Sequence, residues 1–312
     1  MPTLAPTDLT QLSELLSCAS VKGERIDELN LSALNKIIEH RPEDMTVTVE
    51  AGKTVAALQT ELRKQGQWLP IDPPNPETLT IGSLLAENLN GPRRLGFGTI
   101  RDWLIGIRVA LADGTLIRSG GKVVKNVAGY DLMKAFVGSR GTLGVIVEAT
   151  FKLRPVPEVE SFAETTCDSL ESADKLIQQV VDSPLCPVVL DLHQLPGSNP
   201  ILVIGFAGTA DEVEWQIGQA KTLGIQTPAS LEYDRTFWSN TTPAHSVSVL
   251  PSKLVEALQK VDAPFLARAG NGIIYYRGAA PAVVTNPNTA LMQRLKTTFD
   301  PRQTLPDFPF AK

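Results

Sequence analysis

Apolar positions in the first half of the chain recur at two different spacings. After Thr54, apolar residues at positions 55, 58 and 62 follow helical spacing, which predicts a helix that Thr54 caps and that stops by Gly66. The run TVTV at residues 46–49 alternates polar and apolar residues and predicts a strand. Residues 103–120 predict a β-hairpin, because two apolar runs flank an Asp-Gly pair, which favours hairpin turns. Residues 30–40 are predicted to form a short helix or turn.

The second half alternates strand and helix patterns at shorter intervals. Proline-rich "RPVPEVE" (residues 154–160) marks a change in composition, so we place a domain boundary near Leu153. Strand, helix, two strands and a helix follow up to residue 224, which predicts a small α/β unit with antiparallel strands. A further strand and helix occupy residues 246–260, a hairpin is predicted at 265–278, and a last helix at 288–300.

Composition limits the classes of protein that remain. A chain of 312 residues can form two domains, and a net charge of −5 gives no electrostatic reason to expect nucleic acid. Cys18, Cys167 and Cys186 form no CxxC pair, so we expect buried, reduced thiols and neither a zinc site nor an iron–sulfur cluster on this chain. No apolar run reaches the ~20 residues that span a bilayer and no leader pattern is present, so we expect a cytoplasmic protein.

Two standard phosphate-binding motifs fail when tested against the sequence. Gly52-Lys53-Thr54 resembles the end of a P-loop, but Val47 stands where the motif needs glycine. No GxGxxG run lies between a strand and a helix. The glycines of "GSRGTLG" (residues 138–144) can still point backbone N–H groups at phosphates or at a flat polar ring, or they can serve only as tight turns.

Several phrases together carry a family resemblance. "TIGSLLAENLNG", "FGTIRD", "SGGKVVKNVAGYDL" and "GSRGTLGV" follow one another between residues 80 and 145, after "MTVTVEAG". This order resembles the FAD-binding domain of the vanillyl-alcohol-oxidase/PCMH family, and "SGGKVVKNVAGYDL" is similar to the FAD-binding subunit of glycolate oxidase (glycolate dehydrogenase). The close match runs from about Asn30 to Glu158, and the C-terminal "FDP" adds to it.

The resemblance implies an α+β fold in three parts. These are a PCMH-type FAD-binding domain at residues 1–153, a smaller α/β cap domain at 154–265, and a C-terminal segment at 266–312 that returns to the FAD domain. It also implies FAD as cofactor, and oxidation of glycolate, a 2-hydroxy acid, to glyoxylate beside a catalytic flavin subunit and an iron–sulfur subunit. Such partners could hold the chain at a membrane.

The cofactor contacts carry over residue by residue onto the matching phrases. They imply FAD contacts at Pro74, Thr80, Ile81, Gly82, Ser83, Asn88, Gly91, Gly98, Thr99, Asp102, Gly138, Gly141, Thr142, Gly144 and Val145. No catalytic residue is assigned and no metal ligand is expected.

Three departures from the family pattern keep alternatives open. The N-terminal phosphate loop ("prGgGT" in the family) is absent, and Arg140 replaces an acidic residue in "GSEGTLG". The cap motif "H.GDGN.H" has its nearest match at residues 267–277 without any histidine, while His40, His193 and His245 are scattered. The chain is therefore interpreted as an FAD-binding accessory subunit, with a flavin-free structural subunit or an independent FAD-dependent 2-hydroxy-acid dehydrogenase as alternatives.

Overall fold

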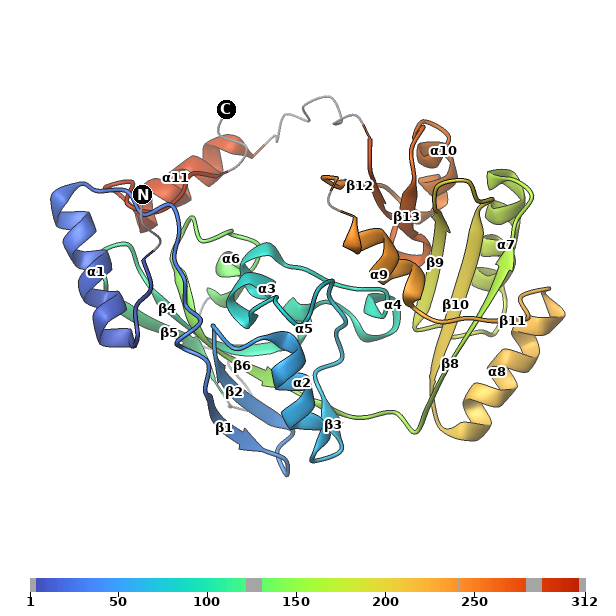
Figure 1. Cartoon of the computed structure of the whole chain (residues 1–312), viewed down its shortest axis with the longest axis horizontal. Coiled ribbons are helices and arrows are strands. Elements are labelled where there is room, and N and C mark those ends of the chain that lie inside the picture. Colours follow the sequence, from blue (N-terminus) through green and yellow to red (C-terminus); the bar gives the residue numbers. More distant parts are fainter. Residues whose placement is uncertain (1–3, 122–130, 241, 279–287, 309–312) are drawn as a thin grey trace. The chain divides into compact units, whose positions relative to one another are not determined.

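The computed structural model describes residues 4–121, 131–240, 242–278 and 288–308. The chain forms two compact units, each built around an antiparallel sheet (Figure 1). Unit 1 contains the described parts of residues 1–89, 99–156 and 284–312, and unit 2 contains residues 90–98 and the described parts of 157–283. Each unit has its own core and is described by itself.

Unit 1 is organised by a five-stranded antiparallel sheet with the order β1-β2-β6-β4-β5. Strands β3 and β7 form a separate two-stranded sheet. The strands are β1 (Ile37–Arg41), β2 (Thr46–Glu50), β3 (Gln67–Trp68), β4 (Leu104–Ala110), β5 (Leu116–Gly120), β6 (Val145–Lys152) and β7 (Arg154–Pro155). The helices are α1 (Leu9–Lys22), α2 (Val55–Arg63), α3 (Ile81–Glu87), α5 (Ile100–Trp103), α6 (Met133–Phe136) and α11 (Thr289–Phe299).

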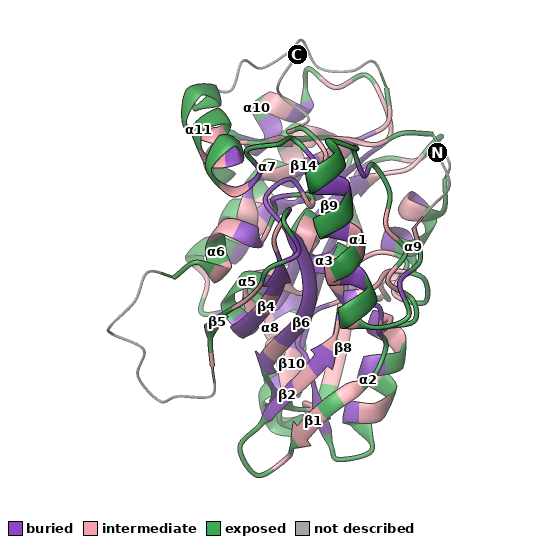
Figure 2. Cartoon of the chain, turned by 90° about the vertical axis from the view of Figure 1, so that its left-hand side faces the viewer, coloured by how far each residue is buried: buried purple, intermediate pink, exposed green. Residues whose placement is uncertain are grey.

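The core of unit 1 explains why these elements form. Central strands β2, β4 and β6 carry mostly buried residues, whereas the edge strand β1 carries none (Figure 2). Helix α1 presents Leu12 and Leu16, both 0% exposed, to apolar residues of β4, β6 and the C-terminal segment. Asp8 caps α1 by accepting a hydrogen bond from the Gln11 N–H, and Gly23 ends it in the left-handed conformation.

Unit 2 is a seven-stranded antiparallel sheet with the order β11-β8-β10-β9-β13-β14-β12. Its strands are β8 (Val159–Thr166), β9 (Val189–Gln194), β10 (Ile201–Gly208), β11 (Thr227–Pro228), β12 (His245–Ser248), β13 (Phe265–Arg268) and β14 (Ile273–Tyr276). Its helices are α4 (Arg94–Phe97), α7 (Leu170–Asp182), α8 (Ala210–Thr222), α9 (Glu232–Ser239) and α10 (Leu254–Leu258), with short 3-10 turns η1 (Pro251–Lys253) and η2 (Ala269–Asn271).

Helices cover both faces of this second sheet. Successive strand residues point to opposite faces; accordingly, Leu202, Ile204 and Phe206 of β10 pack with α7, α8 and α10. Val203, between them, packs instead with Tyr233 and Phe237 of α9. Residues on either face of the sheet are therefore buried in a core.

Most sequence expectations for the elements are confirmed. Thr54 caps α2, residues 104–120 form the β4-β5 hairpin, and both large sheets are antiparallel. The helix or turn expected at residues 30–40 is wrong for its second half, because residues 37–41 pair with β2 as a strand. Helix α9 was not predicted. No helix among the described residues is long and apolar enough to cross a membrane.

Two further expectations need correction. The C-terminal return was expected from residue 266, but β13 and β14 pair within the second sheet, and among the described residues only 288–308 return to unit 1. The cysteines are all free thiols, but only Cys167 is buried, and Cys18 and Cys186 are exposed.

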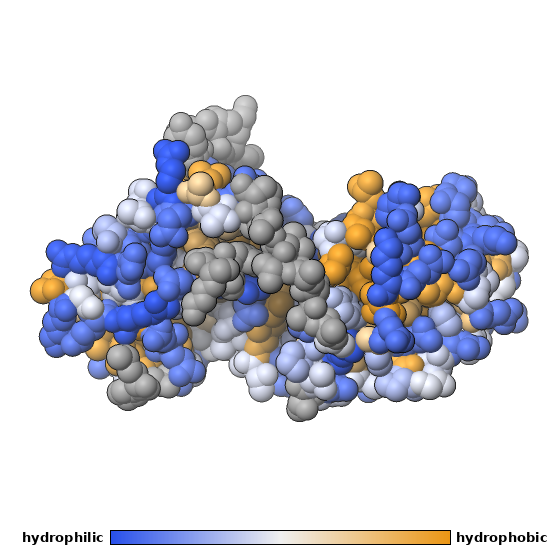
Figure 3. Space-filling view, turned by 90° about the horizontal axis from the view of Figure 1, so that it is seen from above, coloured by the Kyte–Doolittle hydropathy of each residue, from blue (hydrophilic) through white to orange (hydrophobic). Residues whose placement is uncertain are grey.

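Most of "SGGKVVKNVAGYDL" falls at residues 122–130, outside the described residues. Hydrophilic side chains cover much of the surface seen in Figure 3, with apolar ones in separate patches.

Candidate functional site: a cofactor-sized cavity in unit 1

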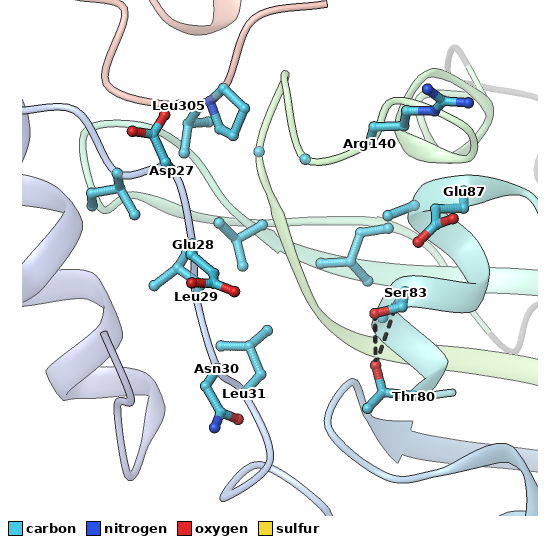
Figure 4. Close-up of a pocket in the computed structure, with 18 of the residues that line it drawn as sticks. Asp27, Glu28, Leu29, Asn30, Leu31, Thr80, Ser83, Glu87, Arg140 and Leu305 are labelled. Carbon is cyan, nitrogen blue, oxygen red and sulfur yellow. Dashed lines mark hydrogen bonds between the residues drawn. The ribbon is translucent and has the colours of Figure 1, made fainter. Parts of the chain in front are cut away.

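An open cavity of about 930 Å³ lies within unit 1. This is within the size range of ligand and cofactor pockets, roughly 300–1,000 Å³. Its lining comes from residues 26–32, α3 with its cap residue Thr80, the loop that enters β6, and the C-terminal segment (Figure 4). The lining residues are Ile26, Asp27, Glu28, Leu29, Asn30, Leu31, Ser32, Thr80, Gly82, Ser83, Ala86, Glu87, Arg140, Gly141, Gly144, Val145, Ile146, Leu305 and Pro306.

The wall formed by α3 offers hydroxyl groups rather than free backbone donors. Thr80 caps α3, accepting a hydrogen bond from the Ser83 N–H at 3.2 Å, and its hydroxyl lies 3.1 Å from the Ser83 hydroxyl (Figure 4). The N–H groups of Ile81 and Gly82 already donate to the carbonyls of Lys53 and Ala51. A Cβ on Gly82 would meet the Cβ of Ala51 at 3.1 Å, so close packing alone accounts for this glycine.

The wall formed by the loop before β6 is a tight turn. The Thr142 N–H donates to the Ser139 carbonyl at 3.0 Å, and the two central residues, Arg140 and Gly141, have φ of 53° and 74°. Two positive φ values at the centre are typical of a type I′ turn. A Cβ on Gly141 would meet no atom within 4 Å, whereas one on Gly144 would lie 2.6 Å from Val109 Cγ1. The turn therefore has open space at Gly141 and is tightly packed at Gly144.

Charge is unevenly distributed around the cavity. Asp27 and Glu28 lie on the side formed by residues 26–32, and Glu87 and Arg140 lie on the opposite side (Figure 4). Arg140 is the one cationic side chain among the lining residues. Asp27 pairs with Arg25, which does not line the cavity, at 2.5 Å. The lining thus carries more negative than positive formal charge, at exposed positions where water screens it.

The structure brings together some of the sequence-predicted contact residues and not others. Those that line the cavity are Thr80, Gly82, Ser83, Gly141, Gly144 and Val145. Ile81 and Thr142 are fully buried beside it, and Pro74 lies in the loop before α3. Asn88 ends α3 in the left-handed conformation. A Cβ added to Gly138 would lie 3.6 Å from the Asn88 Cβ. Thr99 and Asp102 form the capping box of α5, and Gly91 and Gly98 belong to unit 2.

Sequence reasoning missed the wall formed by residues 26–32 and by Leu305 and Pro306. Neither segment carries a motif. The apolar spacing of Ile26, Leu29 and Leu31 was the available signal, since Ile26 is buried and Leu29 and Leu31 pack against the core of unit 1.

A second group of buried polar residues lies in unit 2. Arg268 of β13, 1% exposed, donates to Asp191 of β9 and to Asp234 of α9, at 2.5 Å each. The Tyr233 hydroxyl also donates to Asp191 at 2.7 Å. Burial raises the pKa of Asp191 to about 6, although the Arg268 charge opposes this shift. The pKa of Arg268 is raised by the two carboxylates, against the effect of its burial, so its guanidinium stays charged.

His193 lies beside this cluster, stacked on Tyr233 with ring centroids 4.6 Å apart. Burial lowers the pKa of His193 to about 4, so the ring is neutral at physiological pH. Neither ring nitrogen has a hydrogen-bond partner among the described residues. The His40 ring meets Gln67 Oε1 at 2.9 Å.

Comparison with known proteins decides the family. Residues 19–120 match the model of the FAD binding domain family. Glycolate oxidase subunit GlcE of Escherichia coli (strain K12) is 40% identical over 245 residues, which cover 78% of this chain and 66% of that protein. The chain belongs to the PCMH-type FAD-binding family.

Other members of the PCMH-type family cover less of the chain. Glycolate oxidase subunit GlcD of Bacillus subtilis (strain 168) is 37% identical over 52% of this chain and 35% of its own length. A probable mitochondrial D-lactate dehydrogenase of Danio rerio is 32% identical over 62% of this chain and 42% of its own. The chain thus spans between about a third and two thirds of the length of these curated relatives.

Solved structures support the same fold. An alkyldihydroxyacetonephosphate synthase superposes with a TM-score of 0.72 at 16% identity, covering 96% of this chain and 75% of that one. The fold is therefore that of PCMH-type FAD-binding proteins, as expected from the sequence.

FAD is the cofactor of this oxidoreductase family. The cavity fits such a group in volume, in the hydroxyl groups of Thr80 and Ser83, and in the open space at Gly141. Arg140 is the one cationic lining side chain that could pair with the FAD phosphates. The carboxylates on both sides of the cavity would weaken the binding of the negatively charged pyrophosphate.

Proposed function

We propose that this chain is an FAD-binding accessory subunit of a glycolate dehydrogenase (glycolate oxidase) complex, acting with a catalytic flavin subunit and an iron–sulfur subunit. The observation that carries this proposal is the 40% identity to subunit GlcE, which extends over 245 residues and through both units. Helix α3 and the loop before β6 line the same cavity, which supports the part of the proposal that concerns FAD.

FAD, when bound, supplies a two-electron acceptor for oxidising a 2-hydroxy acid such as glycolate to glyoxylate. The residues proposed to hold it are Thr80 and Ser83 through their hydroxyls, Gly141 through its backbone, and Arg140 through its charge. Residues 267–277, the nearest match to the family's cap motif, contain no histidine, and Arg268 among them is buried and bonded to two carboxylates. Such a group cannot accept a proton from a substrate hydroxyl, which favours an accessory role over independent catalysis.

The test compares the isolated chain with the assembled complex. The chain is purified alone, reconstituted with FAD and freed of excess cofactor; a second preparation is co-expressed with a catalytic flavin subunit and an iron–sulfur subunit. We expect a flavin absorption band in the isolated chain, co-purification of the three subunits, and glycolate-dependent reduction of an artificial acceptor by the complex only.

Other outcomes favour the alternatives. Rapid glycolate turnover by the isolated chain would indicate an independent 2-hydroxy-acid dehydrogenase. A colourless chain that still assembles, after attempted reconstitution, would indicate a flavin-free structural subunit. Failure of the three subunits to assemble would contradict the proposed complex.

A further inference from the structure

A buried ion pair lies beside the cavity without lining it. Lys296 of α11 is 2% exposed and Asp300, one helical turn later, is 0% exposed. The Lys296 Nζ donates to Asp300 Oδ2 at 2.6 Å. A buried ion pair adds little net stability compared with a well-packed apolar pair, and it needs further hydrogen bonds to offset the cost of removing both charges from water.

Those remaining hydrogen bonds go to two walls of the cavity. The Lys296 Nζ also donates to the carbonyl of Thr142 at 3.1 Å and to that of Leu305 at 2.9 Å. Asp300 in turn accepts from the N–H groups of Thr304 and Leu305, at 2.9 and 2.8 Å. Thr142 follows Gly141 in the turn before β6, and Leu305 itself lines the cavity.

The wall formed by residues 26–32 is connected to the C-terminal segment through a backbone hydrogen bond. The Ile26 N–H donates to the Thr304 carbonyl at 2.8 Å, and Ile26 begins the segment that lines the opposite side. One residue earlier, Arg25 pairs with Asp307 at 2.7 Å. The turn before β6, the C-terminal segment and residues 26–32 are thus all connected through the Lys296–Asp300 pair.

From these contacts we propose that Lys296 and Asp300 are positioning residues for the cavity, which hold three of its four walls, all but α3, at the separation that the ligand requires. The inference rests on the proposed function in taking FAD as that ligand. Neither side chain touches the cavity, so their effect on the ligand acts through Thr142, Leu305 and Ile26.

The experiment uses the full chain and three variants. Lys296→Met removes the cation, and Asp300→Asn removes the anion with little change of shape. Lys64→Met is the matched control, because Lys64 also pairs with a carboxylate on a unit 1 helix, at 2.7 Å from Glu61, but is exposed. For each protein, FAD dissociation constants are measured by flavin fluorescence at a temperature where the variant is fully folded, and hydrogen exchange is followed by peptide.

We expect Lys296→Met and Asp300→Asn to weaken FAD binding by about tenfold or more per folded molecule, the scale on which supporting residues act on a bound group. Amide exchange should rise in residues 139–146 and 304–306 and stay unchanged in the sheet of unit 2. Lys64→Met should change neither readout.

A lowered melting temperature with wild-type FAD affinity and wild-type exchange at 139–146 would show that the pair is merely structural and would overturn the inference. If Lys296→Met fails to fold, Asp300→Asn decides by the same two readouts. If the wild type itself binds no FAD, the proposed cofactor role fails. The exchange at 139–146 and 304–306 then still decides whether the pair holds the walls in place.

Discussion

At the scale of single residues, neighbouring glycines in one loop turn out to be glycines for different reasons. Gly144 is buried against Val109 and Phe136, so a side chain there would collide with the core. Gly141 has φ of 74° and no protein atom near its missing Cβ, so a side chain there would strain the backbone and enter the cavity. Both glycines line the cavity, but tight packing accounts for Gly144, whereas Gly141 has open space and a positive φ.

This difference predicts distinct effects of two alanine substitutions. Gly144→Ala should lower the free energy of unfolding by about 1–3 kcal/mol, the usual effect of overpacking, with little change in the FAD affinity of the folded protein. Gly141→Ala should cost about 1 kcal/mol in backbone strain and, in addition, weaken flavin binding. The larger Gly141→Val should abolish flavin retention. Urea unfolding and flavin titration measure the two quantities.

Gly66→Ala calibrates the backbone term, because Gly66 has φ of 66°, open space around it, and no place in the cavity lining. Flavin affinity that is unchanged in Gly141→Val, relative to Gly66→Ala, would remove this turn from the cofactor site.

At the scale of elements, residues 26–32 are a wall without regular structure, apart from a bridge between Leu29 and Leu4. The sequence contains no match to the "prGgGT" phosphate loop that the family resemblance leads one to expect, and this wall brings the carboxylates of Asp27 and Glu28 to the cavity. Backbone N–H groups attract a pyrophosphate, whereas carboxylates repel it. The cavity should therefore hold FAD less tightly than one built with the loop.

Removing a lining charge should then tighten FAD binding. We expect Glu28→Gln to lower the FAD dissociation constant about threefold at low ionic strength, because two charges a few ångströms apart in water interact by about 1 kcal/mol or less. The gain in affinity should vanish near 1 M salt, where the Debye length is only about 3 Å and the charges are screened from each other. Flavin titrations at two salt concentrations measure both effects.

Glu43→Gln is the control, an exposed carboxylate in unit 1 that does not line the cavity. An equal gain from both variants would mean that net charge alone, rather than the wall, governs affinity.

At the scale of the whole molecule, unit 2 contains two buried groups that make its stability depend on pH in opposite directions. Unit 2 buries a neutral histidine whose pKa is lowered from 6.5 to about 4. In the unfolded chain this group binds a proton below about pH 6.5, so its contribution to stability is present above that pH and is lost as pH falls towards 4. Asp191 acts oppositely, because its pKa is raised from 3.8 to about 6 and protonation in that window favours the folded state.

A His193→Phe variant isolates the histidine contribution, since Asp191 is common to both proteins and the ring packing on Tyr233 is retained. Between pH 6.5 and 4 the wild type should lose about 3 kcal/mol of stability relative to the variant, from a shift of about 2.5 units at 1.36 kcal/mol each. Hydrogen-exchange protection factors in β9 and β13 measure this loss, and unit 1 provides the internal control. Parallel pH profiles for the two proteins would contradict the prediction.

The sequence by itself determined the local elements and the family. Capping residues, the Asp-Gly turn and apolar periodicity act over a few residues. They therefore specify α2, the β4-β5 hairpin and the strands independently of the tertiary structure. The glycine-rich phrases identify the FAD-binding domain because they stand in a fixed order. Tertiary structure alone decided that residues 37–41 form a strand, since their pairing partner on β2 overrides local preference.

It alone also decided the roles of particular side chains. Arg268 meets Asp191 and Asp234 across 77 and 34 residues of chain, and Lys296 reaches Thr142 across 154. Burying a charge is unfavourable unless partners satisfy it, and those partners come from elements far apart in the sequence. No local pattern can therefore reveal which arginine or lysine is buried, or that three walls of the cavity are connected through one ion pair.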